Sequence, residues 1–313
     1  MRTMLSGLSM LLAALFAAAS LAGHQVDQLL RDEEPIREIA GGLPTEDQFS
    51  EAVSEMLVEE LSEHLPQAVQ SLVGERAESA VAEAVEGMLE DEQTREAWEE
   101  VLQSTRMDYA DQLNRLFHEG SSGDPQELAV ALDLSPVAEA LTEPLREGLE
   151  STLGWLPFVE DESFDVLAPE VVVDVDAAAQ GGVDPYTWAS LAAASEHWAV
   201  FAVVAVVLAA LGLLLGHGRG RWAVLSLGGL LAAAVAVWVA LTAASPNFGQ
   251  PEGLPAAALA ILDHVETGIT EWAQSVWWIF AGVSGGVALA GMLAAITVPP
   301  ADRGETGDHR SRL

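Results

Sequence analysis

The chain of 313 residues contains no cysteine. This absence excludes disulfide bonds, thiolate nucleophiles and zinc sites with cysteine ligands. A domain outside the cytoplasm would therefore depend on its hydrophobic core for stability, and about 170 residues are enough to build one such core.

Lysine is also absent, so all 13 basic residues are arginines, against 48 aspartates and glutamates. Residues 24–195 hold 40 of these acids and 7 of the arginines, an excess of 33 acids. Such a segment repels nucleic acids and anionic lipid headgroups, so we expect neither to bind it. Cations and basic proteins remain as candidate partners.

Most familiar catalytic signatures are lacking as well. We find no Walker-type phosphate loop, no H-E-x-x-H zinc motif and no dinucleotide fingerprint after a strand, and we expect no serine nucleophile elbow. The long apolar segments contain no charged residue that would mark an ion or proton path. The sequence therefore predicts neither a catalytic site nor a bound cofactor.

Three internal segments are long, apolar and free of charge, namely 197–216, 222–244 and 276–298. Each has the roughly 20 residues that a helix needs to cross about 30 Å of hydrocarbon. Tryptophans, which favour the membrane interface, lie near their ends: Trp198, Trp222, Trp238, Trp277 and Trp278. We expect three membrane helices here rather than buried core helices of a soluble fold.

A fourth apolar segment, residues 5–23, is either a retained membrane anchor or a cleaved signal peptide. Ser20 and Ala22 have the spacing that a signal peptidase accepts, but the apolar run is longer than usual and only Arg2 precedes it. We favour the retained anchor, which would comprise residues 1–23. Both alternatives carry the chain from residue 24 onward across the membrane.

The arginines predict the orientation, because basic residues accumulate on the cytoplasmic side. Arg219 and Arg221 lie in the turn 217–221, and further arginines lie at both ends of the chain: Arg2, Arg303, Arg310 and Arg312. We expect a multi-pass protein of the plasma (cytoplasmic) membrane with both termini in the cytoplasm. Its predicted parts are the anchor 1–23, an extracytoplasmic acidic domain 24–196, a transmembrane hairpin 197–244, an extracytoplasmic loop and amphipathic helix 245–275, a transmembrane helix 276–298 and a cytoplasmic tail 299–313.

The acidic domain shows three successive stripes of apolar residues with helical spacing. Thr45 and Gln48 fit a capping box that would open the first helix. The three stripes are Phe49, Val53, Met56, Leu57, Leu61 and Leu65; then Val69, Leu72, Val73, Ala77, Ala80, Val81, Ala84, Val85, Met88 and Leu89; and then Trp98, Val101, Leu102, Thr105, Tyr109, Leu113, Leu116 and Phe117. We expect three helices facing a common core.

Two later stretches, 127–134 and 168–176, have the alternation of short strands. Between them, Ser135 and Pro136 fit an N-cap and the first position of a helix. We expect the strands to pair across this helix and to pack on the helical layer, which a thin sheet needs for stability. The predicted fold class is a mainly α membrane protein with four transmembrane helices and an α-rich extracytoplasmic domain that contains a small two-stranded β element.

The segment 245–275 begins as a loop and becomes amphipathic, with an apolar face of Leu259, Leu262, Val265, Ile269 and Trp272. Such a helix either lies on the outer membrane surface or docks on the acidic domain. We expect docking, because its acids make it a poor binder of lipid surfaces.

Acidic clusters and two histidines are the candidate ligand and sensor residues. Residues 160–165 with Asp174, Asp176 and Asp184 offer oxygen ligands for Ca²⁺. Their spacing matches no EF-hand loop, so a solvated acidic face is the simpler interpretation and the metal assignment stays open. His197 and His264 lie near predicted outer membrane boundaries and would form a pH sensor only if their segments meet. Ordinary interfacial histidines are the simpler interpretation here too.

Several stretches give the chain a family resemblance: TREAWEEVLQSTRMDYADQL at 94–113, VALDLSPVAEAL at 130–141, LGWLPFVE at 153–160 and the arginine-rich turn after the second span. With the order of its parts, the chain resembles uncharacterised integral membrane proteins of high-GC Gram-positive (actinobacterial) bacteria. That resemblance implies four spans and one large external domain between the first two, and it implies no activity. The lack of lysine and the excess of acid depart from the family pattern.

These observations predict a non-enzymatic protein of the cell envelope whose acidic domain binds another envelope component or relays a state to partners. A first alternative is an accessory subunit of a transport or secretion complex. A second, less favoured alternative is a cation-dependent hydrolase that uses Asp174 or Asp176. The expected partners are the lipid bilayer and an envelope protein or membrane complex of unknown identity, and nucleic acid is not expected.

Overall fold

A computed structural model describes residues 2–46, 49, 50, 89, 91–119, 130–133, 135–137, 140, 172–175, 185–242, 244 and 256–297. The chain divides into two compact units. Unit 1 comprises residues 1–25, 194–244 and 273–313, and unit 2 comprises residues 26–193 and 245–272. The described residues are mostly helical.

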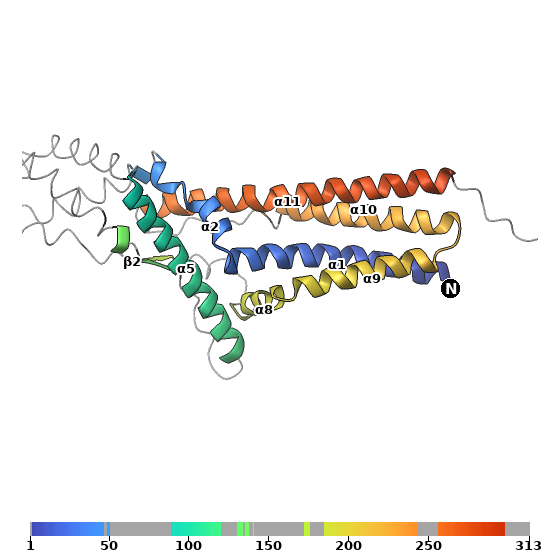
Figure 1. The fold of residues 1–313 in the computed structure, drawn as a ribbon, viewed down its shortest axis with the longest axis horizontal. Helices are drawn as coiled ribbons and strands as arrows, with labels where there is room; N and C mark the ends of the chain where they lie inside the picture. Colours follow the sequence, from blue (N-terminus) through green and yellow to red (C-terminus); the bar gives the residue numbers. More distant parts are fainter. Residues whose placement is uncertain are drawn as a thin grey trace, which may run out of the picture. The chain divides into compact units, whose positions relative to one another are not determined.

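Unit 1 is built from four long helices, labelled in Figure 1: α1 (Arg2–Arg31), α9 (Trp198–Leu215), α10 (Arg219–Thr242) and α11 (Ala256–Thr297). The last residues of α1 and the first part of α11 belong to unit 2. All four helices are long and apolar enough to cross a membrane, as expected of a multi-pass membrane protein. The four predicted membrane helices are therefore confirmed as helices of membrane-spanning length.

Small residues line the contacts inside this bundle. α10 buries Gly228, Ala232, Ala236 and Ala240 at a spacing of four residues. Gly229 lies on the same side of α10, and a Cβ there would lie 2.8 Å from the carbonyl oxygen of Ser284 in α11. The largest exposed side chains of the same helices are aliphatic or aromatic, for example Leu214, Trp238, Leu241 and Ile279. Small residues inside and large apolar residues outside are typical of helices that pack closely in lipid.

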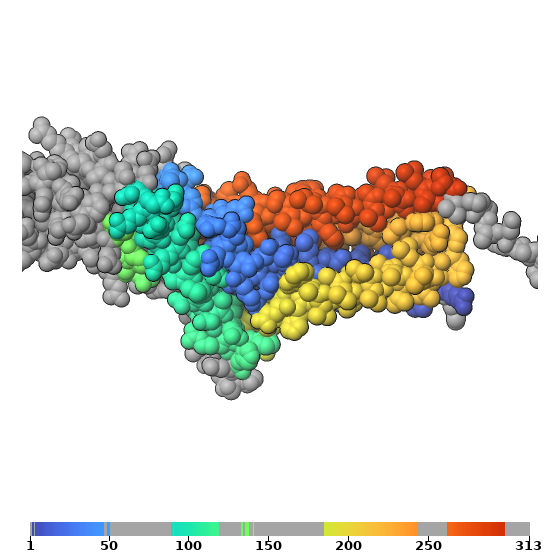
Figure 2. Space-filling model, viewed as in Figure 1, coloured from blue at the N-terminus to red at the C-terminus, as the bar shows by residue number. Residues whose placement is uncertain are grey.

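α1 is hydrogen-bonded to α9 and to α11 in unit 1. The hydroxyl of Ser20 donates to the carbonyl of Trp198 at the start of α9, at 2.9 Å. Near the other end of α9, the buried Ser6 hydroxyl donates to the carbonyl of Gly212 at 2.5 Å. The side-chain amide of Gln25 donates to the carbonyl of Ala273 in α11 at 3.3 Å. Figure 2 shows atoms of α1 between those of α9 and those of α11, so α1 is an integral part of the bundle.

A short turn joins α9 to α10 and contains the two arginines that predict the orientation. Gly218 in this turn has a φ of 55°, a left-handed conformation that suits glycine. Arg219 donates from Nη2 to the carbonyl of Ile296 in the last turn of α11, at 3.3 Å. Helix carbonyls at this end lack partners within the helix, so a cation is favourable there. The guanidinium of Arg221 lies 4.9 Å from the ring centroid of Trp222.

The expected break between an amphipathic helix and the last span is absent. α11 is one helix of 42 residues that continues through 275 and 276. No proline interrupts it between Ala256 and Thr297, so the backbone has no reason to stop. In unit 2, a Cβ on Gly268 of α11 would lie 2.8 Å from the carbonyl oxygen of Ile39, which is the kind of contact that docking on the domain predicts. The loop expected at 245–255 lies outside the described residues.

The described part of unit 2 also contains α2 (Glu33–Ala40), a 3-10 turn η1 (Leu43–Thr45), α5 (Glu92–Glu119) and α8 (Pro185–Ser195). α5 is the third predicted amphipathic helix, and it buries Trp98, Val101, Leu102, Leu113 and Leu116. Phe117, expected in the same core, is 38% exposed instead. The first two predicted helices fall almost entirely on residues 51–88, outside the described residues.

Two four-residue strands, β1 (Val130–Asp133) and β2 (Val172–Val175), pair antiparallel with Val130 opposite Val175 and Asp133 opposite Val172. The two strands are far apart in the chain and lie within the stretches 127–134 and 168–176, where short strands were expected. β1 lies against α5. Leu141, Leu145 and Leu149 of the intervening helix lie outside the described residues. The fold is therefore described as mainly α.

Two expected helix caps differ from the structure. Thr45 belongs to η1 and its hydroxyl donates back to the carbonyl of Gly42 at 2.7 Å, so it does not act as the N-cap of a capping box. Ser135 lies inside its helical segment, and its backbone N–H donates to Oδ1 of Asp133 at 3.0 Å. Bonds from the Ser135 hydroxyl and backbone N–H lower the pKa of Asp133.

The close contact of α10 and α11 makes a matched pair of glycines informative. A Cβ on Gly291 would lie 2.8 Å from the backbone nitrogen of Ser226, whereas a Cβ on Gly282 would meet nothing within 4 Å. We expect Gly291→Ala to lower the stability of the detergent-solubilised chain by about 1–3 kcal/mol through overpacking. Gly282→Ala in the same helix should be neutral or raise it by less than about 1 kcal/mol. Thermal unfolding measures both, and equal responses would show that α10 and α11 do not pack as described.

Candidate functional site

The described residues contain no group of three histidine, aspartate or glutamate side chains that could hold a metal ion. Of the acids considered as Ca²⁺ ligands, residues 160–165, Asp176 and Asp184 lie outside the described residues. Asp174 is in β2, where its Cα pairs with that of Ala131. The structure therefore leaves the Ca²⁺ assignment as an untested prediction.

One serine has the spacing of a nucleophile elbow, a match that the sequence reasoning missed. Residues 282–286 read GVSGG, which fits G-x-S-x-G. The elbow needs a sharp turn between a strand and a helix that exposes the serine. Ser284 instead lies within α11 and is 6% exposed. Its carbonyl faces Gly229 of α10, so this serine belongs to helix packing.

The two histidines of the proposed pH sensor belong to different units. His197 precedes α9 in unit 1, and His264 lies in α11 within unit 2. A third histidine, His24 in α1, has a more defined setting: its ring centroid lies 4.4 Å from that of Trp198, and its Nδ1 is buried without a hydrogen-bond partner among the described residues.

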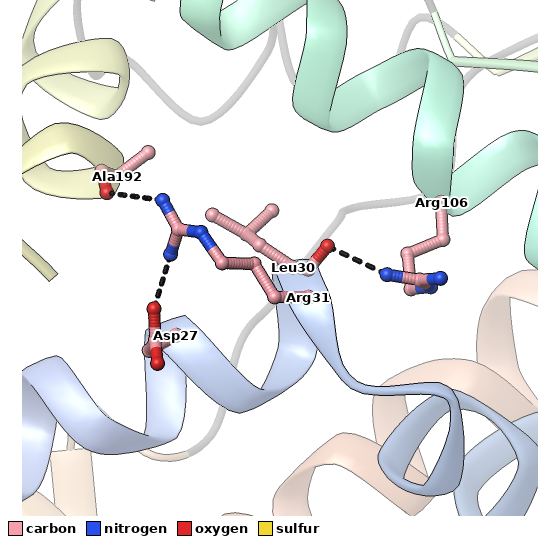
Figure 3. A network of polar contacts seen from close by, with 5 residues as sticks. All are labelled: Asp27, Leu30, Arg31, Arg106 and Ala192. Atoms are coloured by element: carbon pink, nitrogen blue, oxygen red, sulfur yellow. Dashed lines mark hydrogen bonds and ion pairs between the residues drawn. The ribbon is translucent and has the colours of Figure 1, made fainter. Parts of the chain in front are cut away.

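The densest set of long-range polar contacts in the described part of unit 2 surrounds the end of α1. Arg106 of α5 donates from Nη1 to the carbonyl of Leu30 at 2.8 Å (Figure 3). Its Nε donates to Oε1 of Gln103 at 2.9 Å, which holds the guanidinium in place. The last carbonyls of a helix have no partner within the helix and carry partial negative charge. Arg106 therefore caps α1 with a charge-assisted bond from another helix.

Arg31 extends this set toward α8. It forms an ion pair with Asp27 one turn earlier in α1, and its Nη2 donates to the carbonyl of Ala192 in α8 at 3.4 Å. Figure 3 shows the two guanidinium groups on either side of the last turn of α1. We call Leu30, Arg31, Gln103, Arg106 and Ala192 the α1 junction. It joins three helices that are distant in sequence through bonds to main-chain carbonyls.

α5 holds α2 in the same manner. The indole N–H of Trp98 donates to the carbonyl of Ala40, the last residue of α2, at 2.8 Å. Trp98 is 1% exposed, and its ring centroid lies 5.7 Å from that of Phe49. The amide of Gln103 donates to the carbonyl of Glu33, the first residue of α2, at 3.3 Å. α5 thus binds both ends of α2 and the end of α1 through side-chain donors.

A small hydrophobic core between α5 and α8 packs against the α1 junction. Leu113 and Leu116 of α5 pack with Ala189 and Ala192 of α8, and Leu30 and Tyr109 lie against them. Burial raises the pKa of Tyr109, because the phenolate would lose hydration there. The junction therefore combines two arginines with a small hydrophobic core, and its chemistry is that of holding helices together.

Sequence reasoning placed Trp98, Tyr109, Leu113 and Leu116 in a core but gave no role to Arg31, Arg106 or Gln103. α8 was not expected at all. A usable signal was present, because arginine is rare in the acidic segment and Arg106 lies beside the apolar stripe of α5. Its partner, the Leu30 carbonyl, is 76 residues away, and no local pattern identifies it.

A substitution of Arg106 tests this junction. Arg106→Met would leave the partly buried carbonyl of Leu30 without its guanidinium partner, so we expect a loss of about 1–3 kcal/mol in the stability of the detergent-solubilised chain. Arg115 lies in the same helix, and its bond among the described residues is within that helix, to the carbonyl of Asp111 at 3.4 Å. Arg115→Met is therefore the control, with an expected change within about 0.5 kcal/mol. Chemical unfolding followed by circular dichroism measures both, and a neutral Arg106→Met would contradict the capping role.

No family model, no curated protein and no solved structure matches this chain.

Proposed function

We propose that the chain is a non-enzymatic integral membrane protein of the cell envelope that presents an acidic extracytoplasmic domain to another envelope component. Four helices of membrane-spanning length support the membrane assignment. The concentration of 40 acids in residues 24–195 supports a hydrated domain outside the bilayer. The actinobacterial family suggested by the sequence motifs is part of this proposal.

The single observation that carries the proposal is the double role of α1. One end of this helix is bonded into unit 1 through Ser6 and Ser20. The other end is capped by Arg106 and tied to α8 through Arg31, both in unit 2. The helix runs without interruption from Arg2 to Arg31. A membrane helix that continues directly into the acidic unit is suited to presenting that unit or to relaying a change between the two.

The charge of the domain favours particular partners. An excess of acid attracts cations and basic protein surfaces, and it disfavours nucleic acids. The first alternative, an accessory subunit of a transport or secretion complex, differs in that it requires co-purification with a pore-forming or ATP-hydrolysing protein. Solubilisation of native membranes followed by identification of bound proteins separates it from a free-standing envelope protein. The cation-dependent hydrolase has no observation in its favour beyond the acids themselves.

The proposed orientation places both termini and the turn 217–221 in the cytoplasm. Its support is the placement of arginines, since Arg219 and Arg221 lie in that turn. Arg219 also caps α11, so its presence has a structural reason as well. Arg221 and the tail arginines therefore carry more of the orientation argument than Arg219 does.

Single cysteines in a chain without native cysteine test this orientation. We expect Ser122→Cys and Gln250→Cys to react with an impermeant maleimide on intact cells stripped of the outer wall, and His217→Cys and Ser311→Cys to react only after lysis. His217 is exposed, and it is preferred to Gly218 because the φ of 55° there disfavours a side chain. Reaction at 217 from outside would invert the orientation. Protection of 250 after a denaturing wash would mean that α10 or α11 does not cross.

A further inference from the structure

α8 is a helix that lies immediately before the second membrane-length helix and differs in composition from the rest of the acidic segment. Its 11 residues, PYTWASLAAAS, include no charged side chain. Acids begin again at once on either side, with Asp184 before the helix and Glu196 after it. In a segment where acids far outnumber arginines, an uncharged helix marks a surface of different chemistry.

The two sides of α8 have different neighbours. Ala189 and Ala192 are buried against Leu113 and Leu116 of α5. The large side chains of α8 are directed elsewhere: Tyr186 is 43% exposed, Trp188 41% and Leu191 49%. The small side chains therefore make the contact within unit 2. Trp188 and Leu191 are three residues apart and lie on one side of the helix, whereas Tyr186 lies about 160° away from Trp188 around the helix axis. We call Trp188 and Leu191 the α8 face.

The chain connection limits what can cover the α8 face. α8 ends at Ser195 and α9 begins at Trp198. Between them the backbone N–H of His197 donates to the carbonyl of Ala194 at 3.0 Å, so the connection is a tight turn. Three residues reach at most about 10 Å even when fully extended. Where α9 enters the bilayer, the end of α8 is therefore within reach of the headgroup region.

We infer that α8 is an interfacial helix whose face of Trp188 and Leu191 inserts into the headgroup region of the bilayer. This inference rests on the proposed function, because it needs α9 to span the membrane. Tryptophan combines an apolar ring with a polar N–H group and collects at this depth. The absence of charge favours lipids without net charge, since the acidic segment around α8 is repelled by anionic headgroups. Through Arg31 and the α1 junction, the same helix links the lipid surface to the end of α1.

Three single-cysteine variants carrying the fluorophore NBD test this inference. Leu191→Cys probes the α8 face, Val203→Cys probes an exposed position of α9, and Met107→Cys probes an exposed apolar position of α5 between Arg106 and Asp108. The full chain is reconstituted into phosphatidylcholine vesicles, with and without doxyl-labelled phosphatidylcholine. We expect the doxyl lipid to quench the probes at 191 and 203 and to leave the probe at 107 unquenched, with blue-shifted emission at 191 relative to 107.

The other outcomes are distinct. Quenching at 203 without quenching at 191 would overturn the interfacial helix while leaving the membrane assignment intact. In that case blue-shifted emission at 191 would indicate cover by protein, such as a second copy, and emission like that at 107 would indicate water. Absence of quenching at 203 would instead contradict the proposed function, and equal quenching at all three positions would show that the acidic unit lies on lipid without any special role for α8.

A second variant distinguishes insertion of the α8 face from insertion of the attached fluorophore alone. Adding Trp188→Glu to the Leu191→Cys chain places a charge on the α8 face. We expect the quenching at 191 to be lost and the emission to shift to the red, while a Val203→Cys chain with the same change remains quenched. Unchanged quenching at 191 would show that the α8 face does not hold the probe at the lipid surface.

Discussion

A helix that leaves the membrane exposes its last carbonyl groups, and those groups must find hydrogen-bond partners. In this chain the carbonyl of Leu30 receives a bond from Arg106, and Arg31 donates to α8. Both donors are guanidinium groups, which also suit the partial negative charge at this end of α1. The arrangement of α2, α5 and α8 around α1 follows from these bonds and from the packing of Leu30 against Leu113 and Leu116.

The attachment of α1 at both of its ends connects the fold to the proposed function. Within unit 1, α1 is held by small residues and by hydroxyl groups that donate to carbonyls, which is an effective way to join helices in an apolar solvent. Within unit 2, it is held by charged donors and a small core. The proposed function uses this continuous helix, which has a different kind of attachment at each end, as the link between the bilayer and the acidic unit. A sensing or interaction module needs such a link.

The parts that the sequence predicts well are those with strong periodic or compositional signals. The four long apolar segments correspond to α1, α9, α10 and α11, and the stripe from Trp98 to Leu116 corresponds to α5. α8 was missed because an uncharged run such as PYTWASLAAAS has no contrast between an apolar and a polar face. Thr45 was misassigned because a cap motif of four residues does not exclude the 3-10 turn that Pro44 opens.

Contacts between distant residues are the least predictable from the sequence. Arg106 and Trp98 donate to the main-chain carbonyls of Leu30 and Ala40. Every residue has such a carbonyl, so the residue type does not identify the acceptor. The continuity of α11 was also missed, because the change from amphipathic to apolar composition near 275 looks like a boundary although no helix breaker is present. Composition predicts whether a segment suits lipid or water more directly than it predicts where a helix ends.

The central claim is that α1 serves both as a membrane helix and as the support of the acidic unit, which requires that its first half remain in the mature protein. The intact mass of the protein purified from native membranes tests this claim most directly. A mass that includes residues 1–22 agrees with the bonds that Ser6 and Ser20 make to α9. A mass that corresponds to a chain beginning after Ala22 would show that a signal peptidase removes the segment, and it would contradict the account.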